Sequence, residues 1–144
     1  MIYLDTSALV KLYFPEPETA ALTQWLSAKD ESIIFTSFHN LEFNNTLSLK
    51  KGRNEIAPNT CNAVLRRVEH DLQEGVLYSP EVDWEVVFSE ATKLAQAYTP
   101  KIGSRSLDII HVASLIVLGN APLITFDARQ RKLAEKLALQ VISI

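Results

Sequence analysis

The sequence predicts an α/β fold built on a parallel sheet. Short apolar runs typical of buried strands alternate along the chain with longer segments of helical periodicity. The chain has 144 residues, of which 47% are hydrophobic, and this suits one globular domain with its own core. No repeat, low-complexity tract or Gly/Ser-rich linker divides the sequence, so we expect a single domain over residues 1–144.

The first half of the chain carries signals for two strands and four helices. Pro15 and Pro17 are expected to end the first helix, because proline removes the amide donor that the next turn needs. Ser37 is placed to cap the third helix, Gly52 to end it, and Pro58 to stand in the first turn of the fourth. The expected elements are strand 2–4, helix 8–14, helix 18–29, strand 32–36, helix 38–51 and helix 58–75.

The second half continues the alternation. Ser106 is expected to cap a strongly apolar helix that ends at Gly119, and the segment 100–104, which begins with proline, is expected to be a loop. The remaining elements are strand 76–78, helix 84–98, strand 123–126, helix 128–139 and strand 141–144.

Composition narrows the setting in which the protein works. The single Cys61 excludes an intramolecular disulfide, and the N-terminus lacks the features of a signal peptide, so we expect a cytoplasmic protein. The longest apolar run, residues 112–118, is far shorter than the roughly 20 residues that span a bilayer, so no membrane partner is expected. A net charge of −3 argues against broad charge-driven nucleic-acid binding, but it allows a local basic rim around an acidic centre.

Two acids are expected to meet at one edge of the sheet. Asp5 follows the first apolar run, and Asp127 follows the run that starts at Leu123 and contains the hydroxyl of Thr125. Ligand sites in open α/β sheets lie outside the carboxyl ends of the strands, so these distant segments are predicted to share one site. Each aspartate also has a simpler interpretation, as a cap for the helix that follows it.

Two further acids stand in the early turns of helices that should enter from the same edge. Asp108 precedes an almost wholly apolar helix, and Glu42 lies among the apolar residues of helix 38–51. Alone, Asp108 could merely complement the helix dipole, and Glu42 could be a solvated face residue. Four converging carboxylates would repel one another and raise their own pKa values unless a cation intervened. Oxygen-only ligands fit Mg²⁺ or Mn²⁺, which engage phosphates, so phosphodiester cleavage is the predicted chemistry.

The ordered set of motifs resembles PIN-domain ribonucleases, particularly the VapC toxins of type II toxin–antitoxin modules. The blocks are residues 4–13 (LDTSALVKLY), Glu42, residues 105–113 (RSLDIIHVA) and residues 125–129 (TFDAR), and together they cover nearly the whole chain. The resemblance implies a three-layer α/β/α fold with about four to five parallel strands. It also implies Mg²⁺- or Mn²⁺-dependent endoribonuclease activity on RNA, single-stranded or tRNA-like, a homodimer, and a small antitoxin that covers the site.

The resemblance also assigns roles to residues. Asp5, Asp108 and Asp127 would hold the metal or its waters, and Glu42 would complete the acidic cluster. Either Asp127 or Glu42 could orient the attacking water, and the number of ions stays open.

Three polar side chains are expected to support the acids. Ser7 and Thr125 would be supporting hydroxyls, and Arg105 would bind an RNA phosphate or pair with a site acid. For His111, three residues after Asp108, a structural hydrogen bond is favoured over chemistry.

The antitoxin groove and the dimer contacts are predicted within residues 14–49, where the helices carry more apolar side chains than one buried stripe requires. The predicted exposed patch consists of Phe14, Leu22, Trp25, Leu26, Phe38 and Phe43, which could instead fill the core of the domain. Two other functional classes remain open: a catalytically silent PIN-like binding module, and a Rossmann-like nucleotide-binding or phosphatase domain. The second lacks a Gly-rich phosphate loop.

Overall fold

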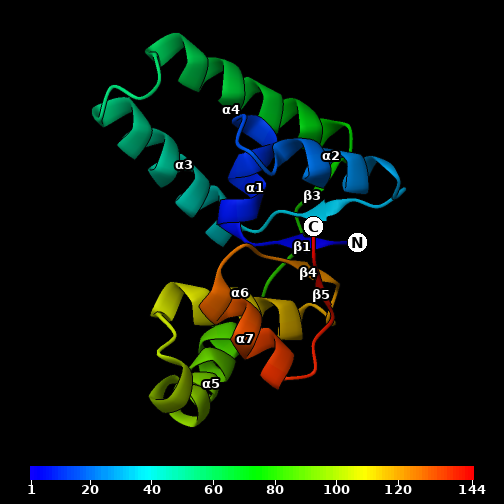
Figure 1. Ribbon diagram of the computed structural model, residues 1–144, viewed down its shortest axis with the longest axis vertical. Helices are drawn as coiled ribbons and strands as arrows, with labels where there is room; N and C mark the ends of the chain where they lie inside the picture. The colour runs from blue at the N-terminus through cyan, green and yellow to red at the C-terminus, as the bar shows by residue number, and fades with distance from the viewer.

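Short parallel strands lie in the middle of the molecule, between two groups of helices (Figure 1). This computed structural model describes all residues, 1–144. Helices α1 to α4 cover one face of the sheet, and α5, α6 and α7 cover the other (Figure 1). The three-layer α/β/α fold expected from the sequence is confirmed.

The sheet has five strands, each of two residues. β1 (Tyr3–Leu4), β4 (Leu123–Ile124) and β5 (Val141–Ile142) pair in parallel, and so do β2 (Ile33–Ile34) and β3 (Leu77–Tyr78). A parallel bridge between Ile2 and Ile33 joins the two groups, which gives the order β3-β2-β1-β4-β5. The strands occur where the sequence predicts them but are shorter. The strand order reverses direction between β1 and β4, the position at which such sheets bind ligands.

Side chains alternate between the two faces of the sheet, as the pleat of a strand requires. Ile2 and Leu4 join the larger core cluster, which packs against α1 to α4, while Tyr3 points to the opposite cluster with Leu115 and Ala134. Burial on both faces explains why the strands are continuous apolar runs.

The helices are α1 (Thr6–Tyr13), α2 (Thr19–Ser27), α3 (Ser37–Gly52), α4 (Pro58–Gln73), α5 (Trp84–Ile102), α6 (Ser106–Val117) and α7 (Ala128–Lys136). Two predicted caps are wrong by one residue. Thr36 caps α3 with its hydroxyl, so Ser37 is the first helical residue, and the His39 ring completes the capping box. Arg105 occupies the cap position of α6 in place of Ser106, and Asp108 accepts a hydrogen bond from its backbone amide at 3.4 Å.

The predicted loop over residues 100–104 is wrong for its first three residues, because α5 continues through Pro100 to Ile102. Proline removes one hydrogen bond, but in the last turn the helix tolerates this loss. The helix ends at Gly103, whose φ of 71° is the left-handed conformation that glycine adopts without strain.

Half of the predicted exposed patch lies in the core. Phe14, Leu22 and Phe43 are buried, and the Phe43 ring packs edge-on against Tyr13 of α1, 5.3 Å between centroids. These residues fill the space between α1, α2 and α3, which the sequence pattern of each helix alone does not reveal. The other three members of the predicted patch, Trp25, Leu26 and Phe38, are half-buried.

No helix combines the length and the apolar composition that crossing a membrane requires. The apolar stretch 112–118 belongs largely to α6, where Val112, Ala113 and Leu115 are buried, as expected from the sequence.

Candidate active site

A cavity of about 790 Å³ lies at the carboxyl edge of the sheet, lined by residues of α1, α3, α6 and the start of α7. Its lining carries five carboxylates against three lysine or arginine side chains. The acids are Asp5, Glu16, Glu42, Asp108 and Asp127, and the bases are Lys11, Lys50 and Arg105. The structure therefore brings all four predicted acids to one cavity, together with Ser7, Arg105 and His111.

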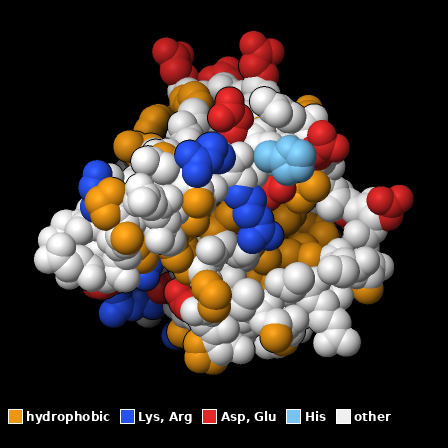
Figure 2. Space-filling view, turned by 90° about the horizontal axis from the view of Figure 1, so that it is seen from above, with side chains coloured by type: hydrophobic (Ala, Val, Ile, Leu, Met, Phe, Trp, Pro, Cys, Tyr) orange, Lys and Arg blue, Asp and Glu red, His pale blue; other side chains and the backbone are white.

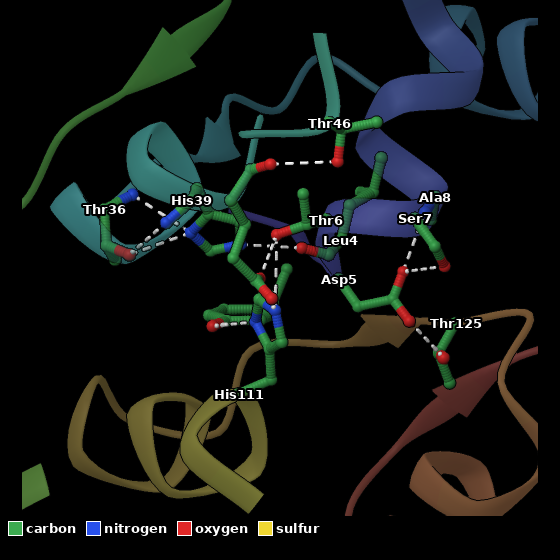
Figure 3. A network of polar contacts seen from close by, with 12 residues as sticks. Leu4, Asp5, Thr6, Ser7, Ala8, Thr36, His39, Thr46, His111 and Thr125 are labelled. Atoms are coloured by element: carbon green, nitrogen blue, oxygen red, sulfur yellow. Dashed lines mark hydrogen bonds and ion pairs between the residues drawn. The ribbon is translucent and has the colours of Figure 1, made fainter. Parts of the chain in front are cut away.

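Asp5 is held on both carboxylate oxygens. Its Oδ1 accepts hydrogen bonds from the Ser7 hydroxyl at 2.8 Å and the Ala8 amide at 2.7 Å, which makes it the cap of α1. Its Oδ2 accepts from the Thr125 hydroxyl at 2.5 Å (Figure 3). Leu4 and Ile124 are paired in register, so the residues that follow them meet directly. Asp5 is therefore the cap of α1 and also lines the cavity, while its catalytic role stays a prediction.

Thr125 is buried behind the cavity wall and connects two of the acids. While its hydroxyl donates to Asp5, it also accepts from the amide of Asp127 at 3.0 Å. Asp127 in turn caps α7, since its Oδ1 accepts from the amides of Arg129 and Gln130 at 2.9 and 2.8 Å. The predicted supporting role of Thr125 thus has a geometric basis, although the catalytic role of the acids stays a prediction.

Arg105 bridges the two remaining aspartates. Its Nε lies 3.1 Å from Asp108 Oδ2, and its Nη2 lies 3.3 Å from Asp127 Oδ2. The hydrogen bond to Asp108 and the charges of both acids raise the pKa of Arg105 above its ordinary value. The side chain is 64% exposed, so it holds these acids from the solvent side. Arg105 was predicted either to bind an RNA phosphate or to pair with a site acid, and in this structure it pairs with two of the acids.

Glu42 is paired with a histidine. His111 Nε2 and Glu42 Oε2 are 2.6 Å apart, and the Thr6 hydroxyl donates to the same oxygen at 2.5 Å. Burial opposes ionisation of Glu42, but the hydrogen bond and charge of His111 and the Thr6 hydroxyl outweigh it, so the pKa of Glu42 is lowered. Glu42 is therefore a carboxylate at neutral pH.

Behind this pair lies a buried polar cluster. The Tyr3 hydroxyl is 2.9 Å from His111 Nδ1, on the ring edge opposite Glu42. His39 Nε2 is 2.8 Å from the Leu4 carbonyl oxygen, and its Nδ1 contacts Thr36. Burial, assisted by the neighbouring His111 and opposed by the Leu4 carbonyl, lowers the pKa of His39 to about 3. His39 is thus a neutral structural residue.

Sequence reasoning missed Tyr3 and Thr6, and it treated His111 as structural. Only weak sequence signals indicated that these residues lie at the site. His111 lies one helical turn beyond Asp108, and the pleat turns Tyr3 away from the apolar Ile2 and Leu4 towards α6.

The donor set fits a hard divalent cation in chemistry, because the aspartates around the cavity offer only oxygen ligands. In this conformation, however, no three His, Cys, Asp or Glu side chains are grouped to hold a metal ion. The exposed Arg105 guanidinium supplies positive charge to Asp108 and Asp127 instead. A cation held by Asp108 and Asp127 would compete with this guanidinium for the same carboxylates.

Comparison with known proteins gives consistent matches. The family model of the PIN domain matches residues 2–136. The chain is 34% identical to Ribonuclease VapC35 of Mycobacterium tuberculosis, which covers 99% of this chain and 96% of that protein. It is 31% identical to Ribonuclease VapC46 of the same organism, again over 99% and 96%.

Solved structures share the fold at lower sequence identity. FitAcB from Neisseria gonorrhoeae superposes with a TM-score of 0.71 at 17% identity, covering 99% of this chain and 97% of that one. VapBC2 from Rickettsia felis, crystallised with a DNA fragment from its promoter, gives a TM-score of 0.65 at 19% identity, with 99% and 98% coverage.

Proposed function

This chain belongs to the PIN-domain family and to its VapC ribonucleases, and we propose that it cuts RNA internally with a divalent cation bound at the acid-lined cavity. The protein is a ribonuclease toxin of a toxin–antitoxin pair. The observation that supports the proposed site best is the convergence of Asp5, Glu42, Asp108 and Asp127, from four separate segments, on one cavity at the switch point of the sheet.

Asp5, Asp108 and Asp127 are the residues that would hold Mg²⁺ or Mn²⁺. When bound, such an ion makes water more acidic and stabilises charge on phosphoryl oxygens. Asp5 is already oriented by Ser7 and Thr125, so its carboxylate keeps one position in the wall. Glu42 faces the cavity as a carboxylate and is placed to accept a proton from water on the substrate side.

Positive side chains at the cavity support an RNA substrate despite the net charge of −3. Arg105, once released from the two aspartates, presents a planar guanidinium that suits a phosphate. Lys50 and Lys11 line the same cavity, where Lys50 is paired with Glu55 at 3.6 Å and Lys11 is paired with Glu16 and Glu18. We propose a single-stranded or tRNA-like RNA, because an open cavity beside these groups admits an unpaired strand more readily than a duplex.

The antitoxin is proposed to dock on α2 and its surroundings. Trp25 and Leu26 are half-buried, and a groove of about 450 Å³, lined by Leu26 of α2, Arg67 of α4 and the strand ends, runs beside them. Figure 2 looks onto this end of the molecule and shows apolar side chains in a hollow, with both basic and acidic side chains around it. An amphipathic helix would lay its apolar face in such a groove. A homodimer and a cytoplasmic location remain parts of the proposal.

The first experiment measures cleavage of a defined tRNA and mRNA panel with Mg²⁺ or Mn²⁺ and with EDTA. Wild type is compared with Asp5→Asn and with Asp71→Asn, a matched control whose carboxylate accepts from the Tyr13 hydroxyl away from the cavity. We expect metal-dependent cutting by wild type and the control, and its loss in Asp5→Asn. A folded wild type that neither binds metal nor cuts any RNA would support the silent-module alternative.

The docking proposal is tested by copurification of the antitoxin with Trp25→Ala and with Trp84→Ala, a half-buried tryptophan on α5 in the other helical layer. We expect loss of the antitoxin only from the Trp25 variant. Retention by both folded variants would contradict this placement.

A further inference from the structure

A chain of three polar side chains connects the centre of the sheet to the cavity. Tyr3 comes from β1, His111 from α6 and Glu42 from α3, and each bonds to the next at 2.9 and 2.6 Å. The Tyr3 side chain is fully buried, and the His111 side chain is only 5% exposed. Glu42 and His111 both line the cavity, and Glu42 is the more exposed of the two, with a side chain that is 20% exposed.

The hydrogen atoms in this chain have one consistent arrangement for a neutral imidazole. Glu42 is a carboxylate and can only accept, so His111 must carry a hydrogen on Nε2. Its Nδ1 is then an acceptor, which the Tyr3 hydroxyl satisfies as donor. Burial strongly raises the pKa of Tyr3, so this hydroxyl keeps its proton. Tyr3 thereby selects the tautomer of His111.

The two oxygens of Glu42 have different surroundings. Oε2 accepts from both Thr6 and His111, while Oε1 has no hydrogen-bond partner within the protein. The imidazole is itself enclosed by aromatic rings, with Phe38 and His39 centroids 4.8 and 5.1 Å away. Figure 3 shows His111 directly beneath Thr6, on the α6 side of the site. One oxygen is therefore anchored and the other is free.

We propose that His111 is a positioning residue for RNA cleavage, which, with Tyr3 behind it, anchors Oε2 of Glu42 so that Oε1 is held free at the cavity. This inference rests on the proposed ribonuclease function and extends it to two residues outside the acidic cluster. An anchored carboxylate needs no reorganisation when it acts on water or substrate, whereas an unanchored Glu42 would sample several rotamers. Loss of the His111 contact is therefore expected to lower turnover and to leave the binding of metal and RNA unchanged.

The test compares variants that differ in the hydrogen bonds they keep. His111→Leu removes the contacts of the imidazole with Tyr3, Thr6 and Glu42, while His111→Gln supplies an amide that can donate to Glu42 and accept from Tyr3. Tyr3→Phe removes only the selecting hydroxyl. Tyr13→Phe is the matched control, because it deletes a tyrosine hydroxyl bonded to Asp71 outside the cavity.

We expect kcat to fall about 10- to 100-fold in His111→Leu, the usual loss for a partner that orients a site residue, with KM and Mn²⁺ affinity unchanged. His111→Gln should recover most of kcat, Tyr3→Phe should lose part of it, and Tyr13→Phe should match wild type. Nitrogen NMR of the wild type should show the Nε2–H tautomer of His111, and Tyr3→Phe should mix the tautomers.

Three results would overturn the inference. One is an unchanged kcat in a folded His111→Leu, another is equal loss in the Leu and Gln variants, and the third is an Nδ1–H tautomer in the wild type, which needs no activity to detect. Failure of the ribonuclease function itself would look different, because the wild type and Tyr13→Phe would then cut no RNA. That result would remove both proposals together.

Discussion

The two sides of the cavity are built on opposite principles. The inner wall consists of Asp5 and Glu42 with the hydrogen-bond donors Thr6, Thr125 and the imidazole of His111. The outer edge consists of Asp108 and Asp127, joined by the guanidinium of Arg105. Asp5 is 3% exposed, whereas the Arg105 side chain is 64% exposed.

The inner carboxylates are thus oriented by hydrogen bonds, whereas the outer carboxylates are neutralised by a positive charge. Short donors that belong to the sheet and the adjoining helices fix the inner carboxylates, and these donors cannot leave without disturbing the fold. The outer carboxylates are neutralised by a long, solvated side chain that can leave at small cost, because exposed ion pairs are weak. The inner wall is thus a permanent part of the fold, and the outer edge is exchangeable.

The largest effect is expected from breaking the inner wall at Thr125. Thr125→Val keeps the side-chain shape but removes the donor to Asp5 and the acceptor for the Asp127 amide. We expect activity to fall about 10- to 100-fold, as for other residues that orient site ligands. Unsatisfied buried groups should also lower the free energy of unfolding by about 1–3 kcal/mol. RNA cleavage and urea unfolding measure the two effects.

Thr125→Ser is the matched control, since it retains the hydroxyl and should restore both quantities to near wild type. Full activity in a folded Thr125→Val would mean that Asp5 needs no orienting partner, and the comparison between the two sides would fail.

Sequence reasoning identified the inner and outer acids and three of their partners, Ser7, Thr125 and Arg105, but not the residues that hold Glu42. Asp5 and Asp127 were predictable because each directly follows a predicted strand, and the carboxyl ends of parallel strands meet at one edge of the sheet. Tyr3 and His111 were not, because their contact depends on how α6 packs against the sheet. A histidine one turn after an aspartate is compatible with many contacts.

The same limit explains the errors in the fold. The cap of α3 is Thr36 and not Ser37. Both residues carry a hydroxyl that can cap a helix, so the sequence alone does not distinguish them, and the choice depends on where the chain leaves β2. Phe43 and Leu22 have the pattern of surplus apolar residues, but α1, α2 and α3 together bury them. Composition and periodicity predict where a helix or strand lies. The packing of neighbouring elements decides which of its apolar faces stays exposed.

The second prediction concerns His39, which lies behind the inner wall, and the pH dependence of the free energy of unfolding. His39 bonds to the carbonyl of Leu4, next to Asp5, and its pKa of about 3 lies below the ordinary 6.5. Between these values the unfolded chain binds a proton that the folded protein does not. The free energy of unfolding should therefore fall as pH falls below 6.5, by up to about 1.4 kcal/mol per pH unit, with no such loss above it.

Urea unfolding from pH 7.5 to 5 measures this slope. His39→Gln keeps a donor for the Leu4 carbonyl and should flatten the slope, while His70→Gln, at an exposed histidine of α4, should not. If His39→Gln leaves the slope unchanged, acid sensitivity does not arise behind the inner wall.

The smallest effect is expected at the outer edge. Arg105→Ala removes the cation that bridges Asp108 and Asp127, so a divalent ion no longer competes with it. Charges that interact across water contribute little, so we expect Mn²⁺ affinity to rise only about three- to tenfold. The gain should shrink at high salt, because screening weakens the arginine contacts that the ion replaces. Thermal stability of the metal-free protein should stay close to wild type.

Mn²⁺ titration at low and high salt separates this effect from others, with Arg53→Ala as the control at an exposed arginine paired only with Glu55. The same Arg105 variant should bind RNA more weakly if the released guanidinium meets a phosphate, so metal affinity and RNA affinity would move in opposite directions. A fall in Mn²⁺ affinity in Arg105→Ala would instead show that the arginine organises the two aspartates for the ion. The outer edge would then be as permanent as the inner wall, and the distinction between orientation and charge would not hold.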